Sequence, residues 1–199
     1  EHGEFGLIRE LGGYFSGLVE GVRPGARYRF RLDESSSLLP DLASRWQPGG
    51  PEGASVVCDP SFPWTDSAWR GVGPRGQVLY ELHVGTFTEE GSWAAALEYL
   101  PRLKQLGVTA LQLMPIAEFA GAFGWGYDVL LPYAPSHRYG APDDARRFID
   151  VAHRLGLGVI LDVVYNPVGP GNHFGDFSPG YFTDRHQGEW GPLLNFDGP

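Results

Sequence analysis

Gly158-Val-Ile-Leu-Asp-Val-Val-Tyr-Asn-Pro-Val-Gly-Pro170 is the stretch that decides the fold of this chain. Its first part is a run of β-branched and aliphatic residues, and a polar loop rich in glycine and proline follows. A strand covered on both faces needs such a continuous apolar run, so we predict a buried parallel strand over residues 158–164. Asp162 interrupts the run, and burying its carboxylate is costly without a cation or hydrogen-bond donors. We therefore place Asp162 at the carboxyl end of the strand, where α/β proteins assemble their sites; a structural, ion-paired aspartate is the alternative.

Two earlier apolar runs predict further strands over residues 79–85 and 108–114. Helical patterns separate the three runs, and strands that alternate with helices form a parallel sheet with right-handed crossovers. The fold class is therefore α/β.

The first helical pattern extends from Trp93 to Leu106. Pro101 must kink or divide this helix, and Gly107 ends it. A second helix begins at Pro142, with acidic residues in its first turn. The predicted apolar face of the first helix consists of Leu97, Leu100, Leu103 and Leu106.

Residues 1–70 follow a different pattern. Tyr28, Phe30 and Leu32 alternate with arginines, which is typical of a strand with one exposed face. Only two or three short strands are visible, whereas a complete sandwich of this kind has about seven. We predict an incomplete β-sandwich and its connection over residues 1–70, followed by an α/β unit over residues 77–199.

Composition excludes several classes of partner. The net charge of -9 disfavours binding to nucleic acid, and no apolar run approaches the roughly 18 residues that span a bilayer. Cys58 is the single cysteine, and its neighbours Val56 and Val57 predict a small buried hydrophobe. Residues 1–20 lack the order of a signal peptide, and Glu1 in place of methionine indicates a cut or processed start. We expect a cytoplasmic protein without membrane or nucleic-acid partners.

The connection between the second strand and the second helix is long and rich in aromatic residues. Flat aromatic faces fit the C–H faces of sugar rings, while carboxylates and amides satisfy hydroxyl groups, so a carbohydrate is the ligand class that fits both. The alternative is that the aromatic residues only pack the loop. The residues concerned are Phe119, Phe123, Trp125, Tyr127, Asp128, Tyr133 and Tyr139, and residues 174–196 repeat this composition.

Five collinear motifs carry a family resemblance: Tyr80-Glu-Leu-His-Val-Gly-Thr-Phe-Thr88, Trp125-Gly-Tyr-Asp128, Tyr133-Ala-Pro135, Asp162-Val-Val-Tyr-Asn166 and Asn195-Phe-Asp-Gly-Pro199. With these motifs the chain resembles the α-amylase family of glycoside hydrolases, and most closely its trehalose-releasing members, the malto-oligosyltrehalose trehalohydrolases. The resemblance implies the first three βα units of a (β/α)8 TIM barrel. It also implies that part of an all-β, immunoglobulin-like carbohydrate-binding-module sandwich precedes the barrel.

The family implies retaining chemistry on α-1,4 glucosidic bonds, with an aspartate nucleophile and a glutamate acid/base. These residues follow the fourth and fifth barrel strands, and a third carboxylate follows the seventh. Residues 77–199 are about half of the roughly 250 residues of such a barrel. No catalytic residue is therefore assigned within this sequence, the chain alone is expected to be inactive, and no cofactor or metal is expected.

The resemblance does carry over residues on the substrate side. The ring of Tyr127 would lie against the sugar at the cleavage subsite, with Asp128 beside it. Asp162 would support the site, paired in the family with an arginine that precedes the nucleophile. The full predicted set is Trp125, Tyr127 and Asp128 for substrate binding, and Asp162, Tyr165 and Asn166 for support of the site.

One position departs from the family pattern. The family has Asn-His where this chain has Asn166-Pro167, and proline has no side-chain donor for a substrate hydroxyl. His173 would then be displaced rather than equivalent to the family histidine, so impaired activity is one implication.

Three functions remain open from the sequence: a trehalose-releasing α-glucan hydrolase, a glycogen branching or debranching relative, and a non-catalytic glucan-binding protein. Sequence beyond Pro199 with an Arg-x-Asp after an apolar strand, and a glutamate after another, would select the enzymes. The expected ligand is a maltooligosaccharide or α-glucan. Self-association is also expected, because residues 159–164 would form an open sheet edge.

Overall fold

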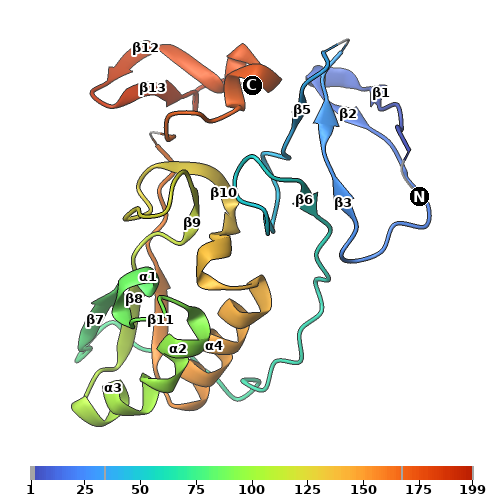
Figure 1. Cartoon of the computed structure of the whole chain (residues 1–199). Helices are drawn as coiled ribbons and strands as arrows, with labels where there is room; N and C mark the ends of the chain where they lie inside the picture. The colour runs from blue at the N-terminus through green and yellow to red at the C-terminus, as the bar shows by residue number, and fades with distance from the viewer. Residues whose placement is uncertain (1–2, 34, 167, 199) are drawn as a thin grey trace.

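The computed structural model describes residues 3–33, 35–166 and 168–198. Figure 1 shows an α/β unit at the lower left, an N-terminal segment of short antiparallel pairs on the right, and a C-terminal hairpin above the α/β unit. Within the described part of the chain, every helix is too short or too polar to cross a membrane.

Three parallel strands form the sheet of the α/β unit. The strands are β7 (Leu79–Leu82), β8 (Ala110–Leu113) and β11 (Gly158–Leu161), in the order β11-β8-β7. Leu79 and Gly158 both lie opposite Ala110, so the three strands are in register at their start. The predicted parallel sheet is confirmed, although each strand is shorter than expected.

The first of these strands ends early for a local reason. Residues 84–87, which the sequence placed partly in the strand, form a helical turn, α1 (Val84–Phe87). The amide of Phe87 donates to the carbonyl of His83 at 2.9 Å, which closes this turn directly after β7. The chain thus leaves the sheet at His83.

Pro101 divides the predicted first helix in two. The pieces are α2 (Trp93–Glu98) and α3 (Leu100–Leu106), with Pro101 in the first turn of α3, where a missing N–H costs nothing. Gly107 caps α3 in the left-handed conformation at φ 100°, as predicted.

The second predicted helix is confirmed as α4 (Pro142–Arg154). Asp144 accepts a hydrogen bond from the Ala141 amide at 2.9 Å and so satisfies a free donor at the start of the helix. Phe148 and Ala152 on α4 are buried in the main core.

The main core lies between this sheet and helices α2, α3 and α4. Leu100 and Leu103 face it as predicted, but Leu106 is 74% exposed, so that part of the predicted helical face was wrong. Leu106 is the last residue of α3. The largest fully buried side chains of this core are Trp93, Phe148, Leu100, Leu111, Leu113 and Leu157.

The prediction that residues 158–164 are buried on both faces was also wrong. Ile160 and Leu161 are 43% and 45% exposed, and Val163 is exposed too. The physical reason is the strand order: β11 stands at the edge of the sheet and, among the residues described, pairs only with β8. Its apolar run is therefore half covered.

The aromatic connection was predicted as a loop, but it contains an antiparallel pair, β9 (Ala117–Phe119) with β10 (Val129–Pro135). A second antiparallel pair, β12 (Phe182–Gly188) with β13 (Gly191–Leu194), forms the C-terminal hairpin. The second half of the chain is thus not purely parallel, because local hairpins pair outside the main sheet. Short helical turns complete it: η2 (His137–Tyr139), α5 (Phe174–Phe177) and η3 (Pro179–Tyr181).

The N-terminal segment contains three small antiparallel pairs. The side chains of Tyr28, Phe30 and Leu32 are half-buried and the arginines between them are exposed, which confirms the predicted alternation. The run is nevertheless split between two partners. The pairs are β1 (Ile8–Arg9) with β2 (Phe15–Ser16), β3 (Arg27–Tyr28) with β6 (Ser55–Val56), and β4 (Phe30–Arg31) with β5 (Leu38–Leu39), and η1 (Leu11–Gly13) lies between β1 and β2.

The connection after β6 is fixed to α4. Asp150 accepts hydrogen bonds from the backbone amide and the hydroxyl of Thr65, both at 2.7 Å. His153 pairs with Asp66 at 2.6 Å and stacks on Trp69 at a ring distance of 4.6 Å. Trp69 of this Pro- and Gly-rich segment therefore packs against α4. The segment follows an ordered path along the helix.

Candidate functional site

The carboxyl ends of β7, β8 and β11 lie at one edge of the parallel sheet, and the candidate site lies there. Asp162 directly follows β11, and its backbone amide donates to the carbonyl of Leu113 at 2.9 Å. The predicted place of Asp162 at the end of its strand is therefore confirmed. Asp162 is half-buried rather than enclosed, because the strand is an edge strand.

Tyr127 reaches Asp162 from the connection between β9 and β10. Its hydroxyl donates a hydrogen bond to Asp162 Oδ2 at 3.1 Å. This bond raises the pKa of the Tyr127 hydroxyl, with smaller contributions from burial and from the charges of Asp162 and Glu81. Two residues predicted separately from the sequence are thus brought together.

Glu81 and Gln112 belong to the same edge, and neither was assigned to the site from the sequence. Gln112 Nε2 donates to Glu81 Oε1 at 3.4 Å, which joins neighbouring strands β8 and β7. The signal for Glu81 was present in the sequence, since a carboxylate inside an apolar strand run is the feature that marked Asp162. This edge of the sheet therefore presents two carboxylates and an amide.

Trp125 and Asp128 flank Tyr127 on the loop between β9 and β10. Trp125 is 74% exposed and Tyr127 45% exposed, and Asp128 is exposed as well. Exposed aromatic faces next to carboxylates can stack on a sugar ring while the oxygens accept from its hydroxyls. The expected binding residues thus stand on an open surface.

Gly126 fixes the loop between Trp125 and Tyr127. Gly126 is buried at φ 87°, and a Cβ there would lie 2.2 Å from the carbonyl oxygen of Pro115. Only glycine permits both this backbone conformation and this close approach to the chain after β8. The tyrosine and tryptophan are therefore held on either side of a backbone contact.

Some of the aromatic residues that were considered for sugar binding are buried and do not reach the surface. Phe119 and Tyr139 are buried and pack in the main core, 6.3 Å apart between ring centres. Phe174 lies in a second buried cluster with Leu42, Leu130, Leu131 and Ala134. For these three residues the alternative interpretation, that aromatic residues pack the structure, is correct.

Among the predicted supporting residues, Asn166 has a clear structural task. Its Oδ1 accepts from the amide of Leu194 at 3.1 Å, which connects the loop after β11 to β13. Tyr165 is exposed. Pro167, at the position where the sequence departs from the family pattern, lies outside the described residues.

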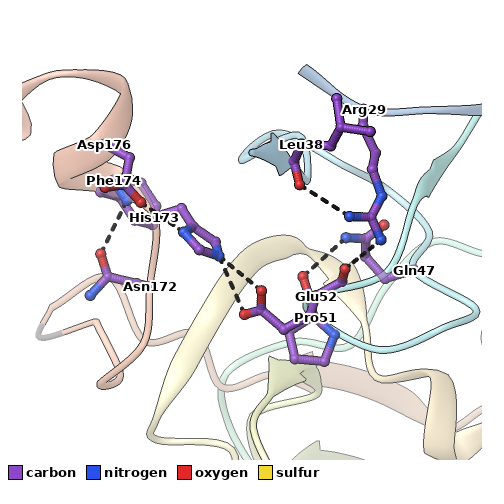
Figure 2. A network of polar contacts seen from close by, with 9 residues as sticks. All are labelled: Arg29, Leu38, Gln47, Pro51, Glu52, Asn172, His173, Phe174 and Asp176. Carbon is purple, nitrogen blue, oxygen red and sulfur yellow. Dashed lines mark hydrogen bonds and ion pairs between the residues drawn. The ribbon is translucent and has the colours of Figure 1, made fainter. Parts of the chain in front are cut away.

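His173 is engaged away from Tyr127 and Asp162. Figure 2 shows its ring between Asp176, which contacts Nδ1 at 2.8 Å, and Glu52 of the N-terminal segment, which contacts Nε2 at 3.1 Å. Burial lowers the pKa of His173, but the hydrogen bonds and charges of Asp176 and Glu52 outweigh burial and raise it. The histidine therefore joins two segments that are far apart in the sequence.

The buried Glu118 pairs with the partly exposed His137, a contact that the sequence did not reveal. Glu118 is fully buried and accepts from the backbone amide of His137 at 3.0 Å and from Nδ1 at 2.9 Å. Burial raises the pKa of Glu118, although His137 opposes this shift. The pair fixes the end of β10 to β9 behind the site. No group of three or more His, Cys, Asp or Glu side chains in the described ranges is placed to hold a metal ion.

Comparison with known proteins gives a consistent result. Residues 60–182 match the family described as "Alpha amylase, catalytic domain". The malto-oligosyltrehalose trehalohydrolase of Deinococcus radiodurans is 50% identical over 195 residues, which are 97% of this chain and 32% of that protein. The enzyme of the same name from Saccharolobus solfataricus is 45% identical and matches 98% of this chain and 35% of its own length.

A solved structure supports the fold. The crystal structure of a "Putative alpha Amylase" from Salmonella typhimurium superposes with a TM-score of 0.93 and 43% identity, and the match covers 96% of this chain and 33% of that one. The chain thus spans about a third of the length of the relatives that it matches.

Proposed function

Because this chain belongs to the α-amylase family of glycoside hydrolases, we propose that the edge around Tyr127 and Asp162 is a glucan-binding wall. The fold is the corresponding part of a TIM-barrel-like glycosidase, with β7, β8 and β11 as its parallel strands. In such barrels the site is built at the carboxyl ends of the strands, which is where Tyr127, Asp162 and Glu81 gather.

The observation that carries the proposal is the hydrogen bond from Tyr127 to Asp162. It places an exposed aromatic ring beside a carboxylate, and these two groups meet the two needs of a sugar, a flat apolar face and an acceptor for hydroxyls. Trp125 and Asp128 extend this surface on the same loop.

The proposed substrate is maltooligosyltrehalose, from which the enzyme releases trehalose by retaining hydrolysis of an α-1,4 glucosidic bond. Support comes from relatives named malto-oligosyltrehalose trehalohydrolase that are 50% and 45% identical over almost the whole chain. The role of this chain within that activity is to bind and orient the glucan. The exposed rings of Trp125 and Tyr127 offer flat apolar faces, and the exposed carboxylate of Asp128 offers acceptors for hydroxyl groups.

Further parts of the proposal concern organisation. Residues 1–70 are proposed to be part of an immunoglobulin-like carbohydrate-binding-module sandwich, supported by the antiparallel pairs β3-β6 and β4-β5. Residues 77–199 are proposed as the first half of the catalytic barrel. A cytoplasmic location fits the free cysteine Cys58.

Binding of maltotetraose by the purified chain, followed by tryptophan fluorescence, tests the proposal. We expect saturable quenching that Trp125→Ala abolishes, with cellotetraose as the β-linked control. Trp190→Ala is the matched variant, because Trp190 is equally exposed but lies on the C-terminal hairpin. Quenching that is the same for both saccharides, or that survives Trp125→Ala, would refute a glucan-binding wall at this edge.

Hydrolysis is the second measurement. The 199-residue chain alone is expected to release no trehalose from maltooligosyltrehalose, because the nucleophile and acid/base of the family follow the fourth and fifth barrel strands, and the parallel sheet described for this chain has three strands. A longer protein that contains this chain is expected to release it. Trehalose formation by the chain alone, proportional to protein and absent from a mock purification, would contradict this division of roles.

A further inference from the structure

His83 lies where three parts of the molecule meet. It directly follows β7, it is half-buried, and its ring faces Gly124 of the loop between β9 and β10. The ring also stands edge-to-face against Tyr139 of η2, with ring centres 5.8 Å apart. The contact with Gly124 links His83 to the proposed glucan-binding wall, because Gly124 directly precedes Trp125.

The hydrogen bonds of His83 define its tautomer. Nε2 lies 3.0 Å from the carbonyl oxygen of Gly124, and since a carbonyl can only accept, Nε2 carries the proton. The hydroxyl of Thr86 lies 3.3 Å from Nδ1, where it can donate to the bare nitrogen. The Tyr139 hydroxyl, 3.2 Å from Nε2, can accept from the same N–H.

The packing around the ring leaves little freedom. A Cβ at Gly85 would lie 2.7 Å from the Tyr139 ring and 3.1 Å from His83, and a Cβ at Gly124 would lie 2.7 Å from Phe119. Two glycines thus allow the backbone to approach the rings of this cluster. The imidazole is therefore held in one orientation, with its N–H directed at the loop.

We propose that His83 is a positioning residue for the glucan-binding wall: its Nε2–H holds the Gly124 carbonyl and so sets the orientation of Trp125 and Tyr127. The inference rests on the proposed function, since the wall is defined by those two side chains. The loop is then fixed at three points, by His83 at Gly124, by Pro115 at Gly126, and by Asp162 at Tyr127.

Two substitutions separate this role from packing alone. His83→Gln keeps a donor at a reach similar to that of Nε2, whereas His83→Asn keeps an amide that is too short. We expect His83→Asn to lower the backbone order parameters of residues 122–128, measured by nitrogen-15 relaxation, below the roughly 0.85 of rigid backbone, and His83→Gln to restore most of the order. Amides of α4, such as that of Phe148, are expected to stay protected in both variants.

Saccharide binding gives the functional readout. His83→Asn is expected to weaken maltotetraose binding about tenfold and His83→Gln to restore it, in step with the backbone order of the loop. If the unaltered chain binds no maltotetraose, the proposed function fails, but the order parameters of residues 122–128 still test the positioning role. Unchanged order parameters of residues 122–128 in His83→Asn, or an equal loss of order in both variants while α4 remains protected, would overturn that role.

Nitrogen NMR of the unaltered chain provides a test that needs no variant. The shifts of the two ring nitrogens of His83 should show a protonated Nε2 and a bare Nδ1. If the variants unfold, this measurement still tests the positioning role. A ring with its only proton on Nδ1 cannot donate from Nε2 to Gly124 and would refute the proposal.

Discussion

The hydroxyl of Tyr127 donates to Asp162 Oδ2 at 3.1 Å, and this bond joins the loop before β10 to the end of β11. The two residues are 35 positions apart in the sequence, and they meet because parallel strands deliver their carboxyl ends to one edge of the sheet. Asp162 thus has a donor that offsets the cost of its partial burial, and Tyr127 has a fixed ring.

Tyr127→Phe removes the hydroxyl and keeps the ring. We expect maltotetraose affinity to fall by about fivefold, because the ring is no longer held by a hydrogen bond worth roughly 1 kcal/mol. Tyr127→Ala should cost distinctly more, since the stacking face is lost as well. Calorimetric titration of both variants checks this order, and equal affinities for the phenylalanine and alanine variants would contradict it.

Asp162→Asn should change how Tyr127 titrates. The hydrogen bond to Asp162, then burial, and then the charges of Asp162 and Glu81 raise the pKa of the Tyr127 hydroxyl. Replacing the carboxylate removes the main cause, so the pKa of Tyr127 should move down towards its ordinary value. Carbon-13 NMR of labelled tyrosines against pH measures this, with Tyr14, which is exposed in the N-terminal segment, as the internal control. An unchanged Tyr127 titration would mean that the bond does not persist in solution.

The bridge from Glu52 through His173 to Asp176 predicts a dependence on pH. Because the pKa of folded His173 lies above the ordinary value of 6.5, the protonated ring binds its carboxylates in the folded state. Its stabilising contribution is fully present below pH 6.5 and is lost as pH rises through the raised pKa. Amide exchange of residues 48–54 should accordingly quicken with pH beyond the intrinsic trend. Glu52→Gln should remove most of this effect, whereas Glu98→Gln, an exposed carboxylate on α2, should leave it intact.

Gly126→Ala and Gly107→Ala form a matched pair for stability. Both glycines have positive φ, and alanine in that conformation costs roughly 1–2 kcal/mol. A Cβ at Gly107 has no neighbour within 4 Å, whereas one at Gly126 lies 2.2 Å from Pro115 O. Gly126→Ala should therefore lower the free energy of unfolding by clearly more than Gly107→Ala, measured by denaturant titration. Equal losses would show that the loop moves away at no cost.

The open edge of β11 predicts self-association of the isolated chain. Ile160 and Leu161 are exposed on a strand that pairs on one side only within the described residues, and such an edge is a template for another strand. Ile160→Lys should reduce the apparent mass in light scattering. Leu106→Lys, which removes an exposed apolar residue from a helix, should not. A monodisperse monomer with strongly protected amides at residues 160–164 would contradict the prediction.

Local sequence patterns were sufficient to predict the three parallel strands and the helices α2, α3 and α4. A short apolar run rich in β-branched residues and preceded by glycine favours a strand, which predicted β11. Pro101 removes one helical N–H and Gly107 adopts a left-handed cap at little cost, which predicted the division between α2 and α3 and the end of α3. The five motifs likewise led to the prediction that Tyr127 and Asp162 belong to one site, and the structure places the two side chains in contact.

Only the tertiary structure decided which side chains are buried and which residues contact one another. The exposure of Ile160 depends on which strands flank β11. The contact of the buried Glu118 with His137 depends on the pairing of β9 with β10. Neither feature can be predicted from the residues adjacent in the sequence. The same holds for His83, whose donor meets Gly124 across 41 positions of sequence. By itself the sequence predicted the three parallel strands, helices α2, α3 and α4, and the residues proposed for a sugar-binding surface. The folded chain alone decided which of them touch, because a hydrogen bond needs two groups within about 3 Å, and only the fold sets that distance.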